Sequence, residues 1–306
     1  MWRGQVTWPL VLAALVAVIG ASGAIADDVG CDGDGDSNAT TIRHHEGVTK
    51  LTLVQFNAEW LFDGQDDPKM SPWYPGKTSC PGMDRCGTRE GAEAHIKRVG
   101  DFLATLDADV LSLNEVENCG VLRRVIELIG GKNSHKPYLI EGVDTYTRQN
   151  VALISKYAPT RALERLSDLH PYPVEGSQCQ YTSTKERRST LSKNYKAELD
   201  INGMLIHVYA AHLKAFPTDP YSCAKREAQA KVLQAGVRAS LDAGREVIVL
   251  GDLNDYSYAY LDAAGDVPTS RVLRILRDVD GDGTDELVNT IRWVHRSDRF
   301  TSWYDR

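Results

Sequence analysis

The sequence lacks several features that would assign it to a common class of protein. None of its six cysteines has the C-x-x-C spacing of a zinc site. It also lacks an excess of positive charge, because 35 Lys and Arg face 42 Asp and Glu for a formal net charge of −7. This balance argues against a domain that holds nucleic acid by bulk charge alone. A nuclease remains compatible with it, because metal ions can supply positive charge at a site.

The first residues have the pattern of a secretory signal, and we assign residues 1–26 to it. Arg3 is the only charged side chain there, an apolar core runs from Leu10 to Ile19, and small residues lie at Ala24-Ile25-Ala26. We therefore expect a secreted protein, with an uncleaved N-terminal membrane anchor as the alternative. Export favours disulfides, and Cys80 and Cys86, which flank a Pro-Gly loop, are the pair that we expect.

Residues 27–48 are polar and rich in Gly and Asp, so we expect a flexible acidic leader before a single domain over residues 49–306. Asp32 to Asp36 resembles the start of a calcium loop. Asp278 to Asp285 is a better match, with Gly283 at the sixth position, but Asn289 stands at the twelfth, where a Glu is expected. A solvated acidic loop is our preferred interpretation, and a structural Ca²⁺ site is the alternative.

The rest of the chain alternates between helical and extended patterns. Helical spacing of apolar residues covers 92–106, 121–129 and 223–242, and apolar runs typical of strands cover 51–56, 109–115, 150–155, 195–201, 204–211 and 247–252. Asn202-Gly203 between two of these runs predicts a hairpin. Residues 167–192 have little pattern, and we expect a loop there. Helix, short turn and strand in succession predict a layered α/β fold.

Polar side chains follow four of the predicted strands. They are Asn57, Glu115, His212, and Asp252 with Asn254. A lone His or Glu at such a position is usually structural, but sites in layered α/β folds form at strand ends, and the set is harder to dismiss.

The chemistry of these residues fits one reaction. Glu115 is a hard oxygen ligand suited to Mg²⁺ or Mn²⁺, with Asn57 to orient it or a metal-bound water. Asp252 can deprotonate or orient an attacking water, with its geometry held by Asn254. His212 can hydrogen-bond a phosphate oxygen as charge builds. We therefore predict metal-assisted hydrolysis of a phosphate ester.

The same residues resemble the endonuclease/exonuclease/phosphatase superfamily of DNase I-like enzymes. The matching segments occur in family order and are Phe56-Asn57-Ala58-Glu59-Trp60, Leu113-Asn114-Glu115-Val116-Glu117, Gln149 to Ser155, Ala211-His212-Leu213-Lys214 and Gly251-Asp252-Leu253-Asn254-Asp255. The resemblance implies a four-layer α/β sandwich of two packed mixed sheets flanked by helices. It implies that Asn57 and Glu115 serve the metal, that His212 contacts phosphate, and that Asp252 and Asn254 position the water.

Two departures from the family pattern stand out. Asn289 falls where many members carry an Asp that orients a catalytic His, so we assign it an orienting role. Members also close with an Asp-His pair on their last strands, whereas this sequence stops at Arg306. We expect that the sequence is truncated and that the last strands of the sandwich are missing.

The leading prediction is a secreted, divalent-metal-dependent phosphodiester hydrolase that acts as an endonuclease on DNA or RNA. Arg187 and Lys214 are candidate phosphate contacts, and we expect a monomer. One alternative is a sphingomyelinase-like or phosphatase-type phosphoesterase, for which no clear apolar hairpin is evident. Another is a non-catalytic calcium-binding or interaction protein on a degenerate fold.

Overall fold

The computed structural model describes residues 31–32, 44–64, 88–144, 147–183 and 185–300. The predicted signal over 1–26, the predicted Cys80–Cys86 pair and most of the first Asp-Gly loop lie outside these residues. In the part of the chain that is described, no helix combines the length and apolarity needed to cross a membrane.

The first sheet has five strands in the order β1-β5-β6-β4-β3. Their bounds are β1 Cys31–Asp32, β3 Leu53–Leu61, β4 Val110–Val116, β5 Lys136–Leu139 and β6 Asn150–Ser155. β3 and β4 run parallel, and the other neighbours are antiparallel. Helices α1 (Arg89–Ala104) and α2 (Cys119–Leu128) cover it, and the apolar spacing of Ile96, Val99 and Leu103 buries one face of α1 in this layer.

The second sheet has four strands in the order β11-β10-β9-β2. Their bounds are β2 His44–His45, β9 Asn194–Ile201, β10 Met204–His212 and β11 Glu246–Asp252. β9 and β10 form the predicted hairpin about Asn202-Gly203, and β11 runs parallel to β10. The long helix α3 (Pro220–Asp242) covers it, with α4 (Val272–Arg277) packed beside α3. Two short 3-10 turns follow, η1 (Thr290–Trp293) and η2 (Arg296–Asp298).

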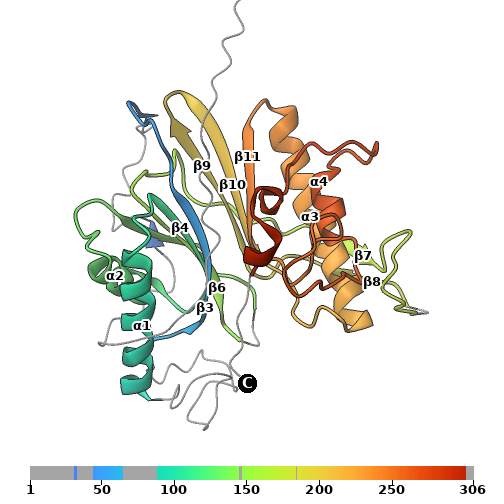
Figure 1. Cartoon of the computed structure of the whole chain (residues 1–306), viewed down its shortest axis with the longest axis horizontal. Coiled ribbons are helices and arrows are strands. Elements are labelled where there is room, and N and C mark those ends of the chain that lie inside the picture. The colour runs from blue at the N-terminus through green and yellow to red at the C-terminus, as the bar shows by residue number, and fades with distance from the viewer. Residues whose placement is uncertain (1–30, 33–43, 65–87, 145–146, 184, 301–306) are drawn as a thin grey trace, which may run out of the picture.

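The two sheets pack face to face. Val110 and Leu153 of the first sheet share one buried apolar cluster with Leu199 and Val208 of the second. The helices lie on the outside, α1 and α2 beside the first sheet and α3 and α4 beside the second (Figure 1). The predicted fold class, packed mixed sheets flanked by helices, is therefore confirmed.

Two short parts of the predicted leader lie in strands. Cys31–Asp32 pairs with β5, and His44–His45 pairs with β9, so both segments belong to the sheets of the domain. A disulfide between Cys31 and Cys119 joins the first of them to the start of α2. Composition could not indicate these two strands, because a strand of two residues has no periodicity. It also cannot indicate which cysteines form a disulfide.

The predicted loop over 167–192 also contains structure. β7 (His170–Tyr172) and β8 (Arg187–Ser189) form a small antiparallel pair. A disulfide between Cys179 and Cys223 ties the segment that joins them to the first turn of α3. Strands of three residues are too short for an alternating pattern to be recognised.

Candidate active site

Four of the predicted residues converge where β3, β4, β10 and β11 end. The amide Nδ2 of Asn57 donates to Glu115 Oε1 at 3.1 Å and to Asp252 Oδ2 at 2.9 Å. His212 Nε2 lies 3.8 Å from Glu115 Oε1 and 4.0 Å from Asp252 Oδ2. Asn57 and Glu115 belong to the first sheet, whereas His212 and Asp252 belong to the second. We call these four residues the strand-end cluster.

Irregular backbone aims the side chains of the first sheet into the cluster. The register of β4 shifts between Asn114 and Val116, and Glu115 between them has φ +65°. The register of β3 shifts after Asn57, with Glu59 and Trp60 also at positive φ. Such bulges turn a side chain out of the regular alternation. Because non-glycine residues at positive φ are strained, this bend is a feature that the surrounding packing maintains.

A close approach of backbones sets the positions of the second sheet. His212 and Asp252 are register partners in the parallel pair of β10 and β11. Gly251 has φ +128°, and a Cβ there would lie 1.9 Å from the carbonyl oxygen of Ala211. Glycine is therefore required one residue before Asp252, so that the strands can bring His212 and Asp252 side by side.

Asn254 stabilises the turn after β11. Its backbone N–H donates to Asp252 Oδ1 at 2.9 Å, and its side-chain Nδ2 donates to the carbonyl of Leu213 at 3.1 Å. It thus orients Asp252 through the main chain, while its side chain holds the segment after β10. Among the described residues its side chain makes no hydrogen bond to the cluster, and the role of Asn254 in positioning the reacting water with Asp252 stays a prediction.

The surroundings of His212 favour its neutral form. The residue is 5% exposed, and among the described residues its Nδ1 has no hydrogen-bond partner. Burial, and then the nearby ammonium of Lys193, lower the pKa of His212 below its ordinary value, against the opposing charges of Asp252 and Glu115. A neutral imidazole can exchange a proton with a bound group, so this state is compatible with acid–base or phosphate-contact chemistry.

A second set of residues supports Glu115 and was missed by sequence reasoning. Gln149 Nε2 donates to Glu115 Oε2, and Gln149 Oε1 accepts from Lys193 Nζ at 3.2 Å. Lys193 in turn pairs with Asp144 Oδ2 at 3.3 Å. Gln149 opens one of the segments that carry the family resemblance, which was a usable signal. Lys193 and Asp144 lie in segments that have neither a family motif nor apolar periodicity. Nothing in the sequence indicated that the two side chains meet.

Glu59 is another acidic group beside the cluster. Burial, and then the charge of Glu115, raise the pKa of its carboxyl above the ordinary value. Its backbone N–H donates to Asn57 Oδ1 at 3.0 Å, which turns the Asn57 amide nitrogen toward the two carboxylates.

The donor set fits a hard divalent cation. Glu115 and Asp252 are 15% and 29% exposed at their side chains, and within the described residues neither pairs with a Lys or Arg. Carboxylate oxygens are the ligands that Mg²⁺ and Mn²⁺ prefer, and a cation would offset the cost of placing two carboxylates together. The Asn57 Nδ2 donates to both carboxylates, which is compatible with the orienting role, and metal ligation by Asn57 stays a prediction.

The three other predicted site residues lie outside the cluster. Asn289 caps η1 through a hydrogen bond to Ile291 N–H at 3.1 Å, and none of its hydrogen bonds among the described residues reaches the cluster. Arg187 on β8 is exposed and lies 5.9 Å from the ring of Tyr221. Lys214 follows His212 by two residues, so the chain itself places it close to the cluster.

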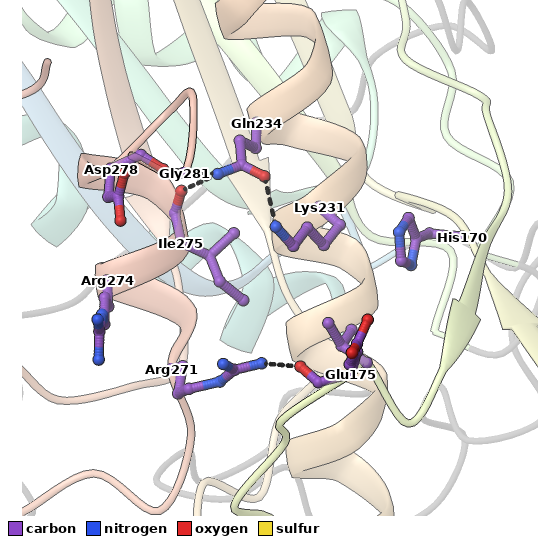
Figure 2. A pocket seen from close by; sticks show the side chains of 10 residues that line it. His170, Glu175, Lys231, Gln234, Arg271, Arg274, Ile275, Asp278 and Gly281 are labelled. Atoms are coloured by element: carbon purple, nitrogen blue, oxygen red, sulfur yellow. Dashed lines mark hydrogen bonds between the residues drawn. The ribbon is translucent and has the colours of Figure 1, made fainter. Parts of the chain in front are cut away.

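A cavity of about 510 Å³ lies elsewhere, between α3, α4 and the segment after β7. Figure 2 shows Lys231 and Gln234 of α3 on one side of it and Arg271 and Ile275 on the other. Gln234 and Arg271 are already engaged with backbone carbonyls of neighbouring segments. No member of the strand-end cluster lines this cavity, so it is separate from the candidate active site.

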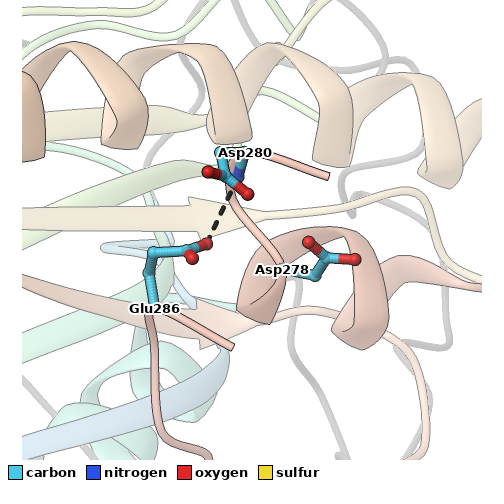
Figure 3. Close-up of side chains that lie close together, drawn as sticks. All are labelled: Asp278, Asp280 and Glu286. Carbon is cyan, nitrogen blue, oxygen red and sulfur yellow. Dashed lines mark hydrogen bonds between the residues drawn. The ribbon is translucent and has the colours of Figure 1, made fainter. Parts of the chain in front are cut away.

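The second Asp-Gly loop brings three carboxylates together. Oxygen atoms of Asp278, Asp280 and Glu286 lie within 4.8 Å of one another (Figure 3). Glu286 accepts from the N–H groups of Val279 and Asp280, so the loop uses this carboxylate to bind its own backbone. A structural Ca²⁺ here stays a prediction, as does the solvated loop.

Solved structures resemble this chain at low identity. An endonuclease/exonuclease/phosphatase from Beutenbergia cavernae DSM 12333 is 17% identical, with 72% of this chain and 50% of that chain covered and a TM-score of 0.40. A β-hairpin deletion mutant of beta toxin from Staphylococcus aureus is also 17% identical, with coverages of 75% and 74% and a TM-score of 0.44. ANGEL2, a 2',3'-cyclic phosphatase, is 14% identical, with coverages of 71% and 59% and a TM-score of 0.39.

This chain therefore spans about half the length of the Beutenbergia protein. No curated protein sequence matches it. The family model described as Endonuclease/Exonuclease/phosphatase family matches residues 83–303, which include Glu115, His212 and Asp252. That match covers more than half of the sequence, and the chain belongs to the Endonuclease/Exonuclease/phosphatase family.

Proposed function

We propose that this protein is a divalent-metal-dependent phosphodiester hydrolase whose substrate is nucleic acid. The family assignment supports a phosphoesterase, and the finer statement rests on the strand-end cluster. The observation that carries it is the Asn57 amide, which joins Glu115 of one sheet to Asp252 of the other. Two carboxylates brought together in this way, beside the buried His212, suit hydrolysis at a phosphate.

Each member of the cluster has a distinct role in this proposal. Glu115 is the carboxylate ligand for Mg²⁺ or Mn²⁺, with its orientation held by Asn57 and Gln149. When bound, the metal supplies positive charge that polarises the phosphate. Asp252 accepts the proton of the attacking water, and His212 hydrogen-bonds a phosphate oxygen as negative charge develops there.

Two features support export of the enzyme. The residues before Ala26 have the pattern of a signal, and the described part of the chain contains the disulfides Cys31–Cys119 and Cys179–Cys223. A secreted nuclease would meet nucleic acid outside the cell, where such disulfides persist. Its substrate contacts then need local positive charge, because the net charge of the chain is −7.

Hydrolysis of bis-p-nitrophenyl phosphate and of plasmid DNA by the full-length chain, with Mg²⁺ or with EDTA, tests the proposal. We expect metal-dependent cleavage that falls at least about 100-fold in Asp252→Asn and Glu115→Gln, since a positioned base contributes roughly that much or more. Asp101→Asn on α1, whose carboxylate is 53% exposed, is the matched control and should retain activity.

Two results would overturn the proposal. Cleavage of sphingomyelin vesicles without cleavage of DNA would make the protein a lipid phosphodiesterase. Calcium binding at Asp278, Asp280 and Glu286 without hydrolysis of any of these substrates would support the non-catalytic alternative.

A further inference from the structure

The segment that leaves β10 presents an exposed aromatic ring a few residues after His212 of the strand-end cluster. Phe216 follows His212 by four residues and is 65% exposed. Its backbone has φ +68°, a left-handed conformation that is strained for a residue with a side chain. Exposure and strain both cost stability, so Phe216 is an unfavourable choice unless the exposed ring has a use.

A buried arginine holds this segment in place. Arg226 of α3 is fully buried, and its guanidinium donates to the carbonyls of Lys214, Phe216 and Pro217 at 3.1, 3.0 and 2.8 Å. Its Nε also pairs at 3.1 Å with Asp255, which follows the turn of Asp252 and Asn254. The same side chain therefore braces the segments that leave β10 and β11. These hydrogen bonds fix the backbone of the segment, so the exposure of Phe216 follows from a defined conformation.

Positive charge lies next to the ring. Lys214 Nζ is 5.0 Å from the centroid of the Phe216 ring, and among the described residues Lys214 has no carboxylate partner. Burial, and then the charges of Lys225 and Lys193, lower the pKa of Lys214.

Two acidic groups near Lys214 are already engaged. Asp144 pairs with Lys193, and Asp219 caps α3 through Ser222. An anion at Lys214 would therefore meet an ammonium that pairs with no carboxylate among the described residues.

The position limits what the ring can reach. Four residues span at most about 14 Å, so the Cα atoms of Phe216 and His212 are no farther apart than that, a distance that one nucleotide beyond a phosphate bound at His212 can cover. A planar base can stack on an exposed aromatic ring, and an ammonium beside it can pair with the neighbouring phosphate. In a duplex, bases are stacked and paired, so their faces are not accessible to such a ring.

We propose that Phe216 and Lys214 form a subsite for the nucleotide that flanks the scissile phosphate, and that this subsite favours single-stranded over duplex nucleic acid. The proposal rests on the proposed function, since it places the scissile phosphate at the strand-end cluster. Phe216 stacks on the flanking base, Lys214 pairs with its phosphate, and Arg226 keeps both side chains in position.

Steady-state kinetics on a single-stranded oligonucleotide and on the same oligonucleotide with an abasic site beside the scissile phosphate test the subsite, because the abasic substrate has no base to stack there. Phe216→Ala should lower kcat/KM for the intact oligonucleotide by about 5- to 100-fold, the range expected for stacking on one base, and leave the abasic substrate unchanged. Phe216→Trp should retain activity, and Phe216→Leu should lose it. Leu169→Ala, which removes another exposed apolar side chain, is the control.

Phe216→Gly separates a binding role from a structural one. Glycine relieves the positive φ, so the Tm should not fall while kcat/KM for the oligonucleotide does. A lower Tm with unchanged kcat/KM would assign Phe216 a structural role and overturn the subsite. Equal losses on both substrates would also overturn it.

Lys214→Gln tests the charge. It should weaken oligonucleotide binding and reduce the slope of log K against log salt concentration by about one. Lys132→Gln on the loop after α2, with a side chain 75% exposed, should leave that slope unchanged.

Binding of a fluorescent single-stranded oligonucleotide in EDTA distinguishes the two proposals, because it requires no catalysis. Binding that depends on Phe216, in a protein that hydrolyses nothing, would refute the proposed function and retain the subsite as a nucleic-acid contact. Hydrolysis of bis-p-nitrophenyl phosphate without Phe216-dependent binding would retain the function and refute the subsite. Binding of sphingomyelin vesicles through Phe216 would show that the ring contacts lipid instead.

Discussion

Asn57 determines the geometry of the candidate site more than any other single side chain. It receives the N–H of Glu59 on its oxygen and donates both amide hydrogens, one to Glu115 and one to Asp252. No other neutral residue of this size can accept from the backbone and donate to two carboxylates at once. The amide therefore offsets part of the repulsion between the two carboxylates before any cation binds.

Replacement of Asn57 by Ala should lower kcat by about 10- to 100-fold and weaken Mg²⁺ activation, because partners that orient metal ligands typically have effects of that size. Asn57→Asp should be worse, since it adds a third carboxylate and removes the donor. Titration of activity with Mg²⁺, with Tm measured in parallel, checks this expectation. An unchanged kcat at saturating Mg²⁺ in both variants would contradict it.

The parallel pair of β10 and β11 carries the second half of the cluster, and its spacing depends on Gly251. The carbonyl oxygen of Ala211 occupies the space that a Cβ at Gly251 would need. Backbone atoms of a hydrogen-bonded strand pair cannot move aside as the end of a flexible side chain can. The contact between His212 and Asp252 therefore depends on the absence of a side chain at the preceding residue.

Gly251→Ala should destabilise the protein by about 1–3 kcal/mol or more through overpacking and abolish hydrolysis by separating His212 from Asp252. Gly244→Ala is the matched control, because Gly244 also has positive φ, but nothing lies within 4 Å of a Cβ built there. Urea unfolding and hydrolysis of bis-p-nitrophenyl phosphate measure the two effects. Equal stability loss in the two variants would show that backbone strain, not the contact with Ala211, is responsible.

At the scale of the whole molecule, a buried histidine links stability to pH. His95 of α1 is 1% exposed, and its Nε2 donates to the carbonyl of Ala58 in β3 at 2.6 Å. Burial lowers the pKa of His95 to about 4, although its bond to Ala58 opposes this. The folded protein therefore keeps His95 neutral at a pH where the unfolded chain protonates it.

Stability should consequently fall as the pH drops from the ordinary His pKa of 6.5 toward 4. The unfolded state binds a proton in this range that the folded state does not, which costs about 3 kcal/mol by pH 4. Urea unfolding of wild type and His95→Gln at pH 7 and pH 4 measures the difference, since carboxylate titration is common to both. The variant should lose less stability than wild type, and equal losses would exclude His95 as the cause.

The elements themselves were largely predictable. The strand over 150–155 was expected with the same bounds that the structure has, and the helices over 92–106, 121–129 and 223–242 were each displaced by only a few residues. Apolar periodicity is a local signal, so long regular elements are readable from it. Segments stabilised from a distance were not, as the strands at Cys31–Asp32 and His44–His45 illustrate.

By itself, the sequence determined the order of the elements and the identity of the polar residues at their ends, because both depend on neighbours along the chain. Only the tertiary structure decided which of these residues meet. Asn57 and Asp252 are 195 positions apart and share a hydrogen bond, whereas Asn289, assigned to the same site from its place in the sequence, caps a turn instead. The hydrogen bond of Gln149 to Glu115 and the contacts of Arg226 also emerged only from packing. The physical reason is that these contacts form between residues far apart in the sequence when the two sheets pack face to face. A local sequence pattern does not indicate which distant residues will meet.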